Sequence, residues 1–442
     1  MSYNFLPYEQ DQLYLMPPSV QEWVREESYT RFLSDVVDQL ALSGRLSCFY
    51  AQYREDGWGA AAFHPGMMVK VLLYGYSNGV VSSRKLAQAL EQDVGFRYLA
   101  ANQTPNFRTL STFRTAHSEA LLALFTESLE LCREAGLVKL GRVSLDGTRV
   151  QGNCALEQNR TRAKLEKLVA ELLASAEATD RAEDAQYGME LRGDELPEKL
   201  RSGEKRVEEL QAALARLNER RDAMRAEQQE VVDAWKKRSG RGRGRRPTDV
   251  EKVDLPEKTT ANMTDPESQA LSTRRGWVQG YNAQAMAESG TQVIVAQQIT
   301  QETNDVHQLI PMLARCEEQA GARPEMLVAD AGYWSNENAD EGDGEMTLLI
   351  AVPARPKTAT SPPSDQYQEM QAQLGKEENR EAYAERKSTI EPVFGQMRTR
   401  GLRTFMLRGK RKAGLEWSLW CATHNLLKLW RARNRQTTPA MA

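Results

Sequence analysis

Three carboxylates stand where an enzyme that transfers phosphoryl groups with metal ions would need them. Asp146 ends the strand-like run 139–145, and Asp330 ends a second such run, 325–329. Glu391 opens a basic segment that we expect to be helical. Two Mg²⁺ ions need shared oxygen ligands, which carboxylates from separate elements supply when they converge. The three residues therefore predict a metal-dependent phosphoryl-transfer centre that uses Mg²⁺, with Mn²⁺ as a substitute.

Each carboxylate taken alone also has a structural explanation. Asp146 precedes a glycine, a pair that is common in turns, and predicts a turn there. Asp330 follows a fully apolar strand, and ligands collect at the carboxyl ends of strands in α/β sheets. The pattern S-x-x-E that ends at Glu391 matches a capping box, and Pro392 suits a first helical turn. Capping and metal binding compete for the same oxygens, so Glu391 has two open interpretations.

The charge of the chain is clustered rather than large. The formal net charge is −3, which by itself does not indicate a nucleic-acid binder. The segment 398–435 nevertheless contains eleven Lys or Arg and one acidic residue, and 236–246 contains seven and none. Clustered charge matters more than total charge for contact with phosphates. We therefore expect a nucleic acid, such as double-stranded DNA, as a partner.

Cysteine spacing and hydropathy exclude other classes of protein. The five cysteines are scattered without a CxxC pair, which argues against a zinc site and a disulfide framework and is typical of a reducing cytosol. The first residues lack the basic and apolar regions of a signal peptide. No apolar stretch approaches the length of a membrane span. These features predict a cytoplasmic protein that does not enter a membrane.

The first 137 residues read as a helical N-terminal domain with a DNA-binding role. Apolar residues at helical spacing predict helices over 20–42, 65–78, 83–90 and 110–135. Short helices separated by turns are typical of a helix-turn-helix DNA reader, and a plain helical bundle fits the same pattern. In the first case the phosphate contacts would be Arg84, Lys85, Arg108 and Arg114.

The rest of the chain reads as an α/β catalytic domain interrupted by an insertion. We expect the catalytic domain to comprise 138–154 and 257–434, followed by a flexible tail, 435–442. Its strands are predicted over 280–286, 292–296, 325–329 and 347–352, and its helices over 305–320, 386–400 and 414–433. The insertion, 155–256, combines leucines at helical spacing with a Gly/Arg linker, which predicts a long helical hairpin.

Five short motifs occur in a characteristic order. They span residues 144–148, 280–284, 304–305, 329–333 and 388–395. With these motifs the chain resembles bacterial insertion-sequence transposases of the DDE class, over roughly residues 8 to 430. The resemblance implies a ribonuclease H-like mixed sheet with a helical N-terminal domain. It also implies that Asp146, Asp330 and Glu391 are the catalytic and metal-binding residues.

Related transposases carry a signature around the glutamate: Tyr, two residues, Arg, three residues, Glu, six residues, Lys. Tyr383 and Arg386 fit its start, but four residues separate Arg386 from Glu391, which leaves open whether Arg386 or Lys387 contacts the DNA end. Arg398 replaces the final Lys and can bind a phosphate with two hydrogen bonds. Solvated helix charges are the alternative explanation. The DNA-binding residues that we expect are Trp334, Tyr383, Arg386, Lys387, Arg398, Arg400 and Arg403.

Trp334 has two interpretations of its own. It follows the second Asp motif directly, so its ring would stack on a splayed base at the DNA end. Packing in the protein core explains it equally well.

The resemblance implies a complete reaction. The protein would bind the terminal inverted repeats of its own insertion sequence, cleave the DNA ends and transfer the 3′-OH strands to target DNA with two Mg²⁺ ions. A homodimer on paired ends is expected, located in the bacterial cytoplasm and at the nucleoid when bound to DNA. The alternatives are a DNA-binding protein that kept the scaffold but lost activity, and a ribonuclease H-like nuclease without strand transfer.

Overall fold

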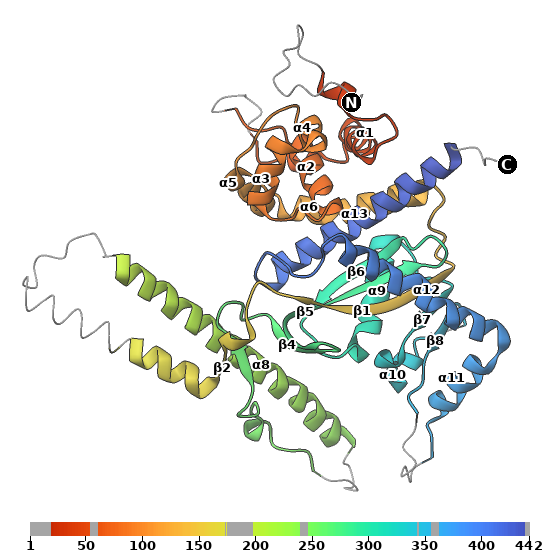
Figure 1. Cartoon of the computed structure of the whole chain (residues 1–442). Coiled ribbons are helices and arrows are strands. Elements are labelled where there is room, and N and C mark those ends of the chain that lie inside the picture. The colour runs from red at the N-terminus through yellow and green to blue at the C-terminus, as the bar shows by residue number, and fades with distance from the viewer. Residues whose placement is uncertain are drawn as a thin grey trace, which may run out of the picture. The chain divides into compact units, whose positions relative to one another are not determined.

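A computed structural model describes residues 19–53, 61–172, 174, 198–238, 246–342, 344–354 and 362–437 (Figure 1). The chain divides into two compact units, Met1–Lys139 with Leu419–Ala442, and Leu140–Ser418. The N-terminal part of the first unit thus ends close to the expected boundary at 137. The first unit also takes residues from 419 onward, which the sequence pattern assigns to the catalytic domain.

The first unit is helical, as expected. Its helices are α1 (Tyr29–Leu42), α2 (Pro65–Ser77), α3 (Ser83–Gln92), α4 (Val94–Leu99), α5 (Phe107–Ala116) and α6 (Ser118–Glu134), with 3-10 turns at Val20–Trp23 and Ser47–Phe49. The single helix predicted over 110–135 is wrong, because the chain breaks between α5 and α6 at His117. Asn106 fixes the start of α5, since its side chain accepts a hydrogen bond from the Thr109 N–H at 2.9 Å.

The second unit is built on a six-stranded mixed sheet. Its strands are β1 (Arg142–Gln151), β4 (Gln269–Thr273), β5 (Gly276–Glu288), β6 (Ile294–Thr300), β7 (Met326–Ala329) and β8 (Thr347–Ile350). The order is β4-β5-β1-β7-β8, and β6 also pairs with β5. β1 is antiparallel to β5 and parallel to β7, and β7 is parallel to β8. The mixed sheet predicted from the sequence is therefore present.

β1 runs without a break through the position where the sequence predicts a turn. Its antiparallel register with β5 continues from Val143↔Glu288 to Gln151↔Gly280. The turn at Asp146 is therefore wrong, because the pairing with β5 continues through Asp146 and holds the residue inside a strand. β5 is buried along most of its length, as a central strand should be.

Helices pack against this sheet. The helices after β6 are α9 (Leu309–Ala320), α10 (Asn336–Ala339), α11 (Asp365–Gly375), α12 (Glu377–Thr399) and α13 (Lys410–Thr437), which continues into the first unit, with 3-10 turns at Val306–Gln308 and Ala331–Tyr333. α12 lies against β1, β5 and β7, and α9 lies against β5 and β6. α9 ends at Gly321, whose φ of 80° is the left-handed conformation that closes a helix. α12 is the element that approaches the carboxylate of β1.

The insertion between β1 and β4 has a small core of its own. It contains α8 (Glu198–Arg238), a helix at 162–172, the strand pair β2 (Asn159–Thr161) and β3 (Thr260–Asn262), and 3-10 turns at Leu156–Gln158 and Val250–Lys252. Leu165 packs with Leu210 and Leu217 of α8 and with Met263. The described part therefore agrees with two helices packed together. The connection predicted between them, and most of the Gly/Arg linker, lie outside the described residues.

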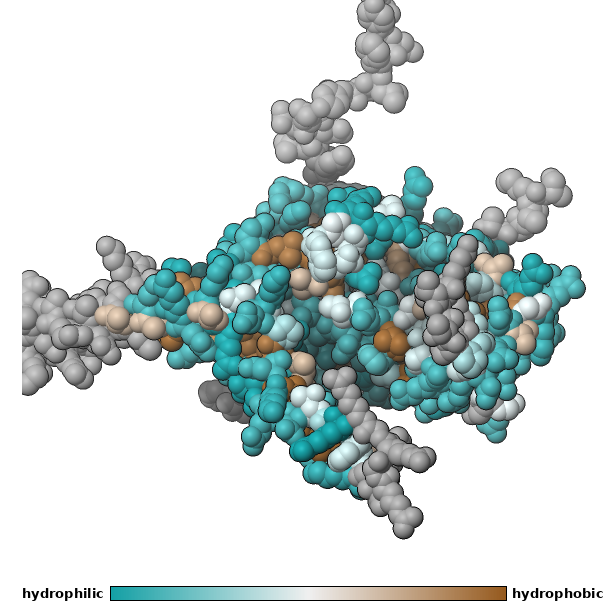
Figure 2. Space-filling model, turned by 90° about the horizontal axis from the view of Figure 1, so that it is seen from below, coloured by the Kyte–Doolittle hydropathy of each residue, from teal (hydrophilic) through white to brown (hydrophobic). Residues whose placement is uncertain are grey.

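The surface is consistent with the composition. Figure 2 shows a mostly hydrophilic face with small, scattered apolar patches. In the part of the chain that the structure describes, no helix is both long and apolar enough to cross a membrane.

Candidate active site

Strand register brings Asp146 and Asp330 together. β1 and β7 are parallel and pair Leu145 with Ala329, so Asp146, the next residue of β1, lies beside Asp330, the residue directly after β7. Neighbouring strands lie about 4.8 Å apart. Asp330 begins the turn after β7, where its side chain accepts a hydrogen bond from the Gly332 N–H at 2.8 Å. The two acids that the sequence singles out thus lie side by side on one sheet.

Nearby positive charge balances only part of the negative charge of the Asp146 carboxylate. Its side chain is only 21% exposed, and Arg386 donates to it across 3.3 Å. The Gly147 N–H adds a bond of 2.7 Å. Burial and the nearby Asp330 nevertheless raise the pKa of Asp146 to about 6, with Asp305 adding to the rise and Arg386 opposing it. The site holds more negative charge than the protein balances.

Asp305 is an acid of this site to which the sequence pattern gave no catalytic role. The amides of Asn282 and Gln284 each donate to its Oδ1 at 2.7 Å. A Cβ at Gly147 would lie 2.8 Å from that same oxygen, so glycine follows Asp146 because Asp305 packs against the strand there. The signal was present in the sequence, since the motifs 280–284 and 304–305 contain the three polar residues.

Gln284 connects Asp305 to the loop after β7. Its side-chain Oε1 accepts a hydrogen bond from the Tyr333 hydroxyl, and its Nε2 donates to Asp305. Tyr333 is fully buried, and burial together with Asp305, Asp146 and Asp330 raises its pKa. The chain from Tyr333 to Asp305 therefore fixes the loop that carries Asp330.

Glu391 lies in the interior of α12 and not at its start. The helix begins at Glu377, and Ser388 donates its hydroxyl to the Glu385 carbonyl at 2.9 Å. The capping-box interpretation is therefore wrong, because the helix has already made several turns. The side chain of Glu391 is exposed. Among the described residues, no three or more His, Cys, Asp or Glu are grouped so that they could hold a metal ion.

Pro392 explains a local feature beside Glu391. A proline inside a helix has no N–H for the carbonyl four residues earlier, which here belongs to Ser388. The Gln292 side chain donates to that carbonyl at 2.8 Å. The loop between β5 and β6 thus supplies the hydrogen bond that the helix lacks, and it fixes α12 against the sheet.

The basic residues of α12 divide into buried and exposed groups. Arg386 is 7% exposed and turned to Asp146, with its guanidinium 6.0 Å from the Tyr383 ring centre. Lys387 is exposed, so of these two it is the one accessible to DNA. Arg398 is exposed as well, and it donates to the Thr148 hydroxyl at 2.5 Å. Thr148 follows Asp146 on the same face of β1, so α12 contacts this face at two points.

The remaining predicted DNA contacts lie at the surface or near it. Arg403 is exposed, and Arg400 is half-buried with its Nε donating to the Gln396 carbonyl at 3.3 Å. Trp334 is half-buried, and its ring meets the Tyr367 ring edge-on at 5.8 Å between centres. Trp334 therefore belongs neither to the core nor to the fully exposed surface.

One of the four N-terminal arginine and lysine candidates has a structural role. Arg114 is 4% exposed, and it donates to the Val81 carbonyl at 2.9 Å and to the Ser83 hydroxyl. It therefore fixes the start of α3 and is unavailable to phosphates. Arg84 and Arg108 are exposed and lie over the Phe107 ring at 5.3 and 5.8 Å.

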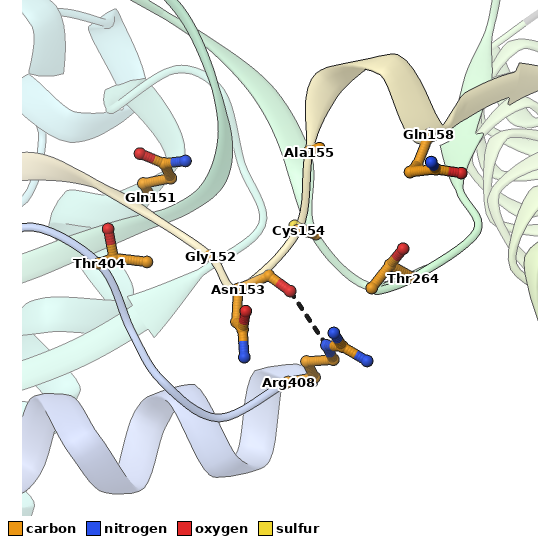
Figure 3. A pocket seen from close by; sticks show the side chains of 9 residues that line it. All are labelled: Gln151, Gly152, Asn153, Cys154, Ala155, Gln158, Thr264, Thr404 and Arg408. Atoms are coloured by element: carbon orange, nitrogen blue, oxygen red, sulfur yellow. Dashed lines mark hydrogen bonds between the residues drawn. The ribbon is translucent and has the colours of Figure 1, made fainter. Parts of the chain in front are cut away.

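A pocket of about 420 Å³ lies at the far end of β1 (Figure 3). It is lined by Gln151, Gly152, Asn153, Cys154, Ala155, Gln158, Thr264, Thr404 and Arg408. Arg408 closes one side by donating to the Asn153 carbonyl at 3.0 Å. None of the carboxylates described above lines the pocket, so it is separate from the candidate active site.

Comparison with known families assigns both ends of the chain. Residues 18–116 match a transposase domain (DUF772), and residues 354–430 match a transposase DDE domain. Both matches are to transposases, which is consistent with an insertion-sequence transposase of the DDE class. This confirms the resemblance and, with the mixed sheet, the ribonuclease H-like fold class. No curated protein and no solved structure matches the chain.

The two matched ranges contain only some of the residues of the candidate site. The DDE domain contains Glu391 with Arg386 and the other basic residues of α12. Asp146, Asp305 and Asp330 fall between the two matched ranges. The roles of individual residues in this protein are therefore proposals.

Proposed function

We propose that the protein binds the terminal inverted repeats of its insertion sequence, cleaves the DNA ends and transfers the 3′-OH strands to target DNA. One observation carries the proposal. Asp146 within β1 and Asp330 directly after the parallel strand β7 lie at neighbouring positions, in a site that is short of positive charge. A homodimer on paired DNA ends is part of the proposal, because both ends must be processed together.

The oxygen ligands suit Mg²⁺ or Mn²⁺. Mg²⁺ is usually bound by one or two carboxylates, with water and substrate phosphates completing the shell, so the pair Asp146 and Asp330 would hold an ion with water in place of the phosphates before DNA binds. Two bound ions would activate the attacking oxygen and stabilise the leaving oxygen of an in-line displacement. Burial of Asp146 beside Asp330 makes the apo site unfavourable, and a cation relieves this repulsion.

Each protein group has a defined task in this proposal. Asp146 and Asp330 hold the metal ions, while Asn282 and Gln284 orient Asp305 behind them. Arg386 balances part of the charge on Asp146. Lys387, Arg398 and Arg403 bind phosphates along α12 and the segment after it, where all three are exposed.

Glu391 is proposed as the acid that completes the site when DNA is bound. It lies on α12 between Arg386 and Arg398, the two residues that touch the Asp146 face of β1. Its exposed side chain is not held by packing. DNA phosphates would draw the metal ions and this carboxylate together.

The direct test is cleavage of a duplex that carries the element's end, with and without Mg²⁺, by the wild type and Asp146→Ala. We expect Asp146→Ala to lose activity about a thousandfold, since metal ions supply several kcal/mol of transition-state stabilisation. Asp254→Ala is the matched control, because Asp254 is exposed and likewise accepts the N–H of the following residue. Equal cleavage by wild type and Asp146→Ala would remove Asp146 from the mechanism.

Strand transfer is tested separately with precleaved ends and a target plasmid. Joined products support the transposase reaction. Cleavage without joining would favour a nuclease, and DNA binding without either would favour a scaffold that has lost activity.

A further inference from the structure

The hairpin between β4 and β5 ends in a fixed, two-residue tip. Thr273 pairs with Gly276, and only Arg274 and Arg275 connect them. The Thr273 hydroxyl accepts from the Arg275 N–H at 3.2 Å and donates to the Gly276 carbonyl at 2.6 Å. Gly276 has a φ of 112°, which other residues adopt only with strain. The tip is therefore a defined structure whose backbone is held in place.

The tip exposes an unusual set of side chains. Trp277 is 63% exposed, and Arg274 and Arg275 are exposed beside it. Within the described residues, none of the three makes a side-chain hydrogen bond, ion pair or ring contact. A large indole left in water next to two unpaired guanidinium groups is a surface without its partner.

The chemistry of the tip favours a polyanion. From Gln269 to Ala287 the two strands and their connection contain no acidic residue. Guanidinium groups bind phosphates with paired hydrogen bonds, and an aromatic ring packs against sugars or bases. The combination of two arginines and one tryptophan thus matches nucleic acid better than an apolar protein surface.

The tip also lies on the strand that builds the active site. Asp146 pairs with Ala285, which lies eight residues beyond Trp277 on β5. At about 3.3 Å per residue this is roughly 26 Å along the strand. B-DNA rises about 3.4 Å per base pair, so a duplex running along β5 from the carboxylates would reach the tip after roughly eight base pairs.

We propose that the β4–β5 tip is a contact for duplex DNA. Arg274 and Arg275 bind phosphates of the terminal repeat, on the element's side of the cleavage point. Trp277 packs against the same DNA backbone. This inference rests on the proposed function, because it takes the DNA from the carboxylate pair. It adds a contact outside α12 and outside both ranges that match transposase families.

The test measures binding of the full chain to a duplex with the inverted repeat that flanks the gene. Arg274→Ala/Arg275→Ala should weaken binding about tenfold and reduce the slope of log K against log salt concentration by about 1.8, for two lost phosphate contacts. Arg315→Ala/Arg323→Ala is the charge-matched control and should change neither, since these surface arginines pair with Glu318 and Glu317. Circular dichroism verifies that each variant is folded.

A footprint locates the contact. Hydroxyl-radical protection roughly eight base pairs from the cleavage point should disappear in Trp277→Ala and in the double variant, while protection at the cleavage point stays. Unchanged affinity, salt slope and footprint in the presence of normal cleavage would overturn the tip contact and leave the proposed function standing. Absence of DNA binding by the wild type would overturn the function itself. If Trp277→Ala instead abolishes self-association and leaves DNA binding intact, the tip is a protein contact and the proposal is wrong.

Discussion

β5 contributes side chains to two groups of acidic residues that differ in how their charge is balanced. Asp265 is 1% exposed and accepts hydrogen bonds from the Tyr281 hydroxyl at 2.8 and 2.9 Å and from the Gly409 N–H at 3.2 Å. Asp146 has one long ion pair and two further aspartates nearby. The Asp265 carboxylate is fully hydrogen-bonded, and we call it the closed group. Asp146, Asp305 and Asp330 hold more negative charge than the positive charge near them, and we call them the open group.

The difference separates structural from chemical roles. A buried carboxylate that is fully hydrogen-bonded joins distant segments of chain, as Asp265 joins β5 to the segment before α13. A group of carboxylates with too little positive charge is unstable alone and favours a cation. The sequence around Asp265 indicates a turn without catalysis, and the Ser268 N–H bonding back to the Asp265 carbonyl at 3.1 Å agrees with that.

The largest effect that we expect tests Glu391 as the acid that completes the site of Asp146 and Asp330 when DNA is bound. Glu391→Gln should lower Mg²⁺-dependent cleavage about a thousandfold. It should leave the Mg²⁺-induced rise in melting temperature of the DNA-free protein unchanged, because Glu391 is exposed and stands apart from Asp146 and Asp330. Asp146→Asn should lose both. The control is Glu381→Gln, an exposed glutamate on the same helix.

Two results would change this assignment. Full cleavage by Glu391→Gln would make Asp305 the next candidate, to be tested with Asp305→Asn. Loss of Mg²⁺ stabilisation in Glu391→Gln would mean that Glu391 reaches the aspartate pair without DNA.

The second prediction concerns pH and stability. The pKa of Asp146 is about 6 in the folded chain, against an ordinary value of 3.8 for an aspartate in water. Between these values the unfolded chain has lost the proton that the folded chain keeps, so folding stability falls as the pH rises through this window. Above it the ionised Asp146 costs on the order of 3 kcal/mol. Asp146→Asn removes this cost in metal-free buffer.

Urea unfolding of wild type and Asp146→Asn from pH 4 to pH 8 measures the difference. The variant should gain stability over the wild type across this range, and Mg²⁺ should close the gap by stabilising only the wild type. If the unfolding free energies of the two proteins differed by the same amount at every pH, ionisation of Asp146 would not destabilise the fold.

The sequence predicts only part of the site around Asp146. It found Asp146 and Asp330 because each follows an apolar run, and strands are read from local pattern. It missed the continuity of β1, since a Gly after an Asp indicates a turn unless β5 and Asp305 are known to pack there. The sequence around Glu391 also predicted a capping box. This was wrong because the helix starts at Glu377, where packing of α12 against the sheet and not the local sequence decides the start.

The third prediction concerns the hydrogen bonds that the buried Asp265 accepts. Tyr281→Phe removes the hydroxyl that donates to both oxygens of the buried Asp265. The carboxylate then loses its main partner, which should destabilise the fold by about 2 kcal/mol. Cleavage by the folded fraction should stay within about twofold of the wild type, since Asp265 holds no metal in our proposal. A selective loss of cleavage without loss of stability would contradict the division between the two groups.

The smallest effect concerns how α12 is held over the open group. Gln292→Ala removes the donor to the Ser388 carbonyl, the carbonyl that Pro392 deprives of its helical partner. Water replaces this exposed bond in part, so we expect a loss of about 0.5–1 kcal/mol in unfolding free energy. Pro392→Ala restores the helical N–H, so Gln292→Ala should have a smaller effect in that background. A double-mutant cycle of unfolding free energies measures this coupling, and strict additivity would show that Gln292 does not substitute for the missing helical bond.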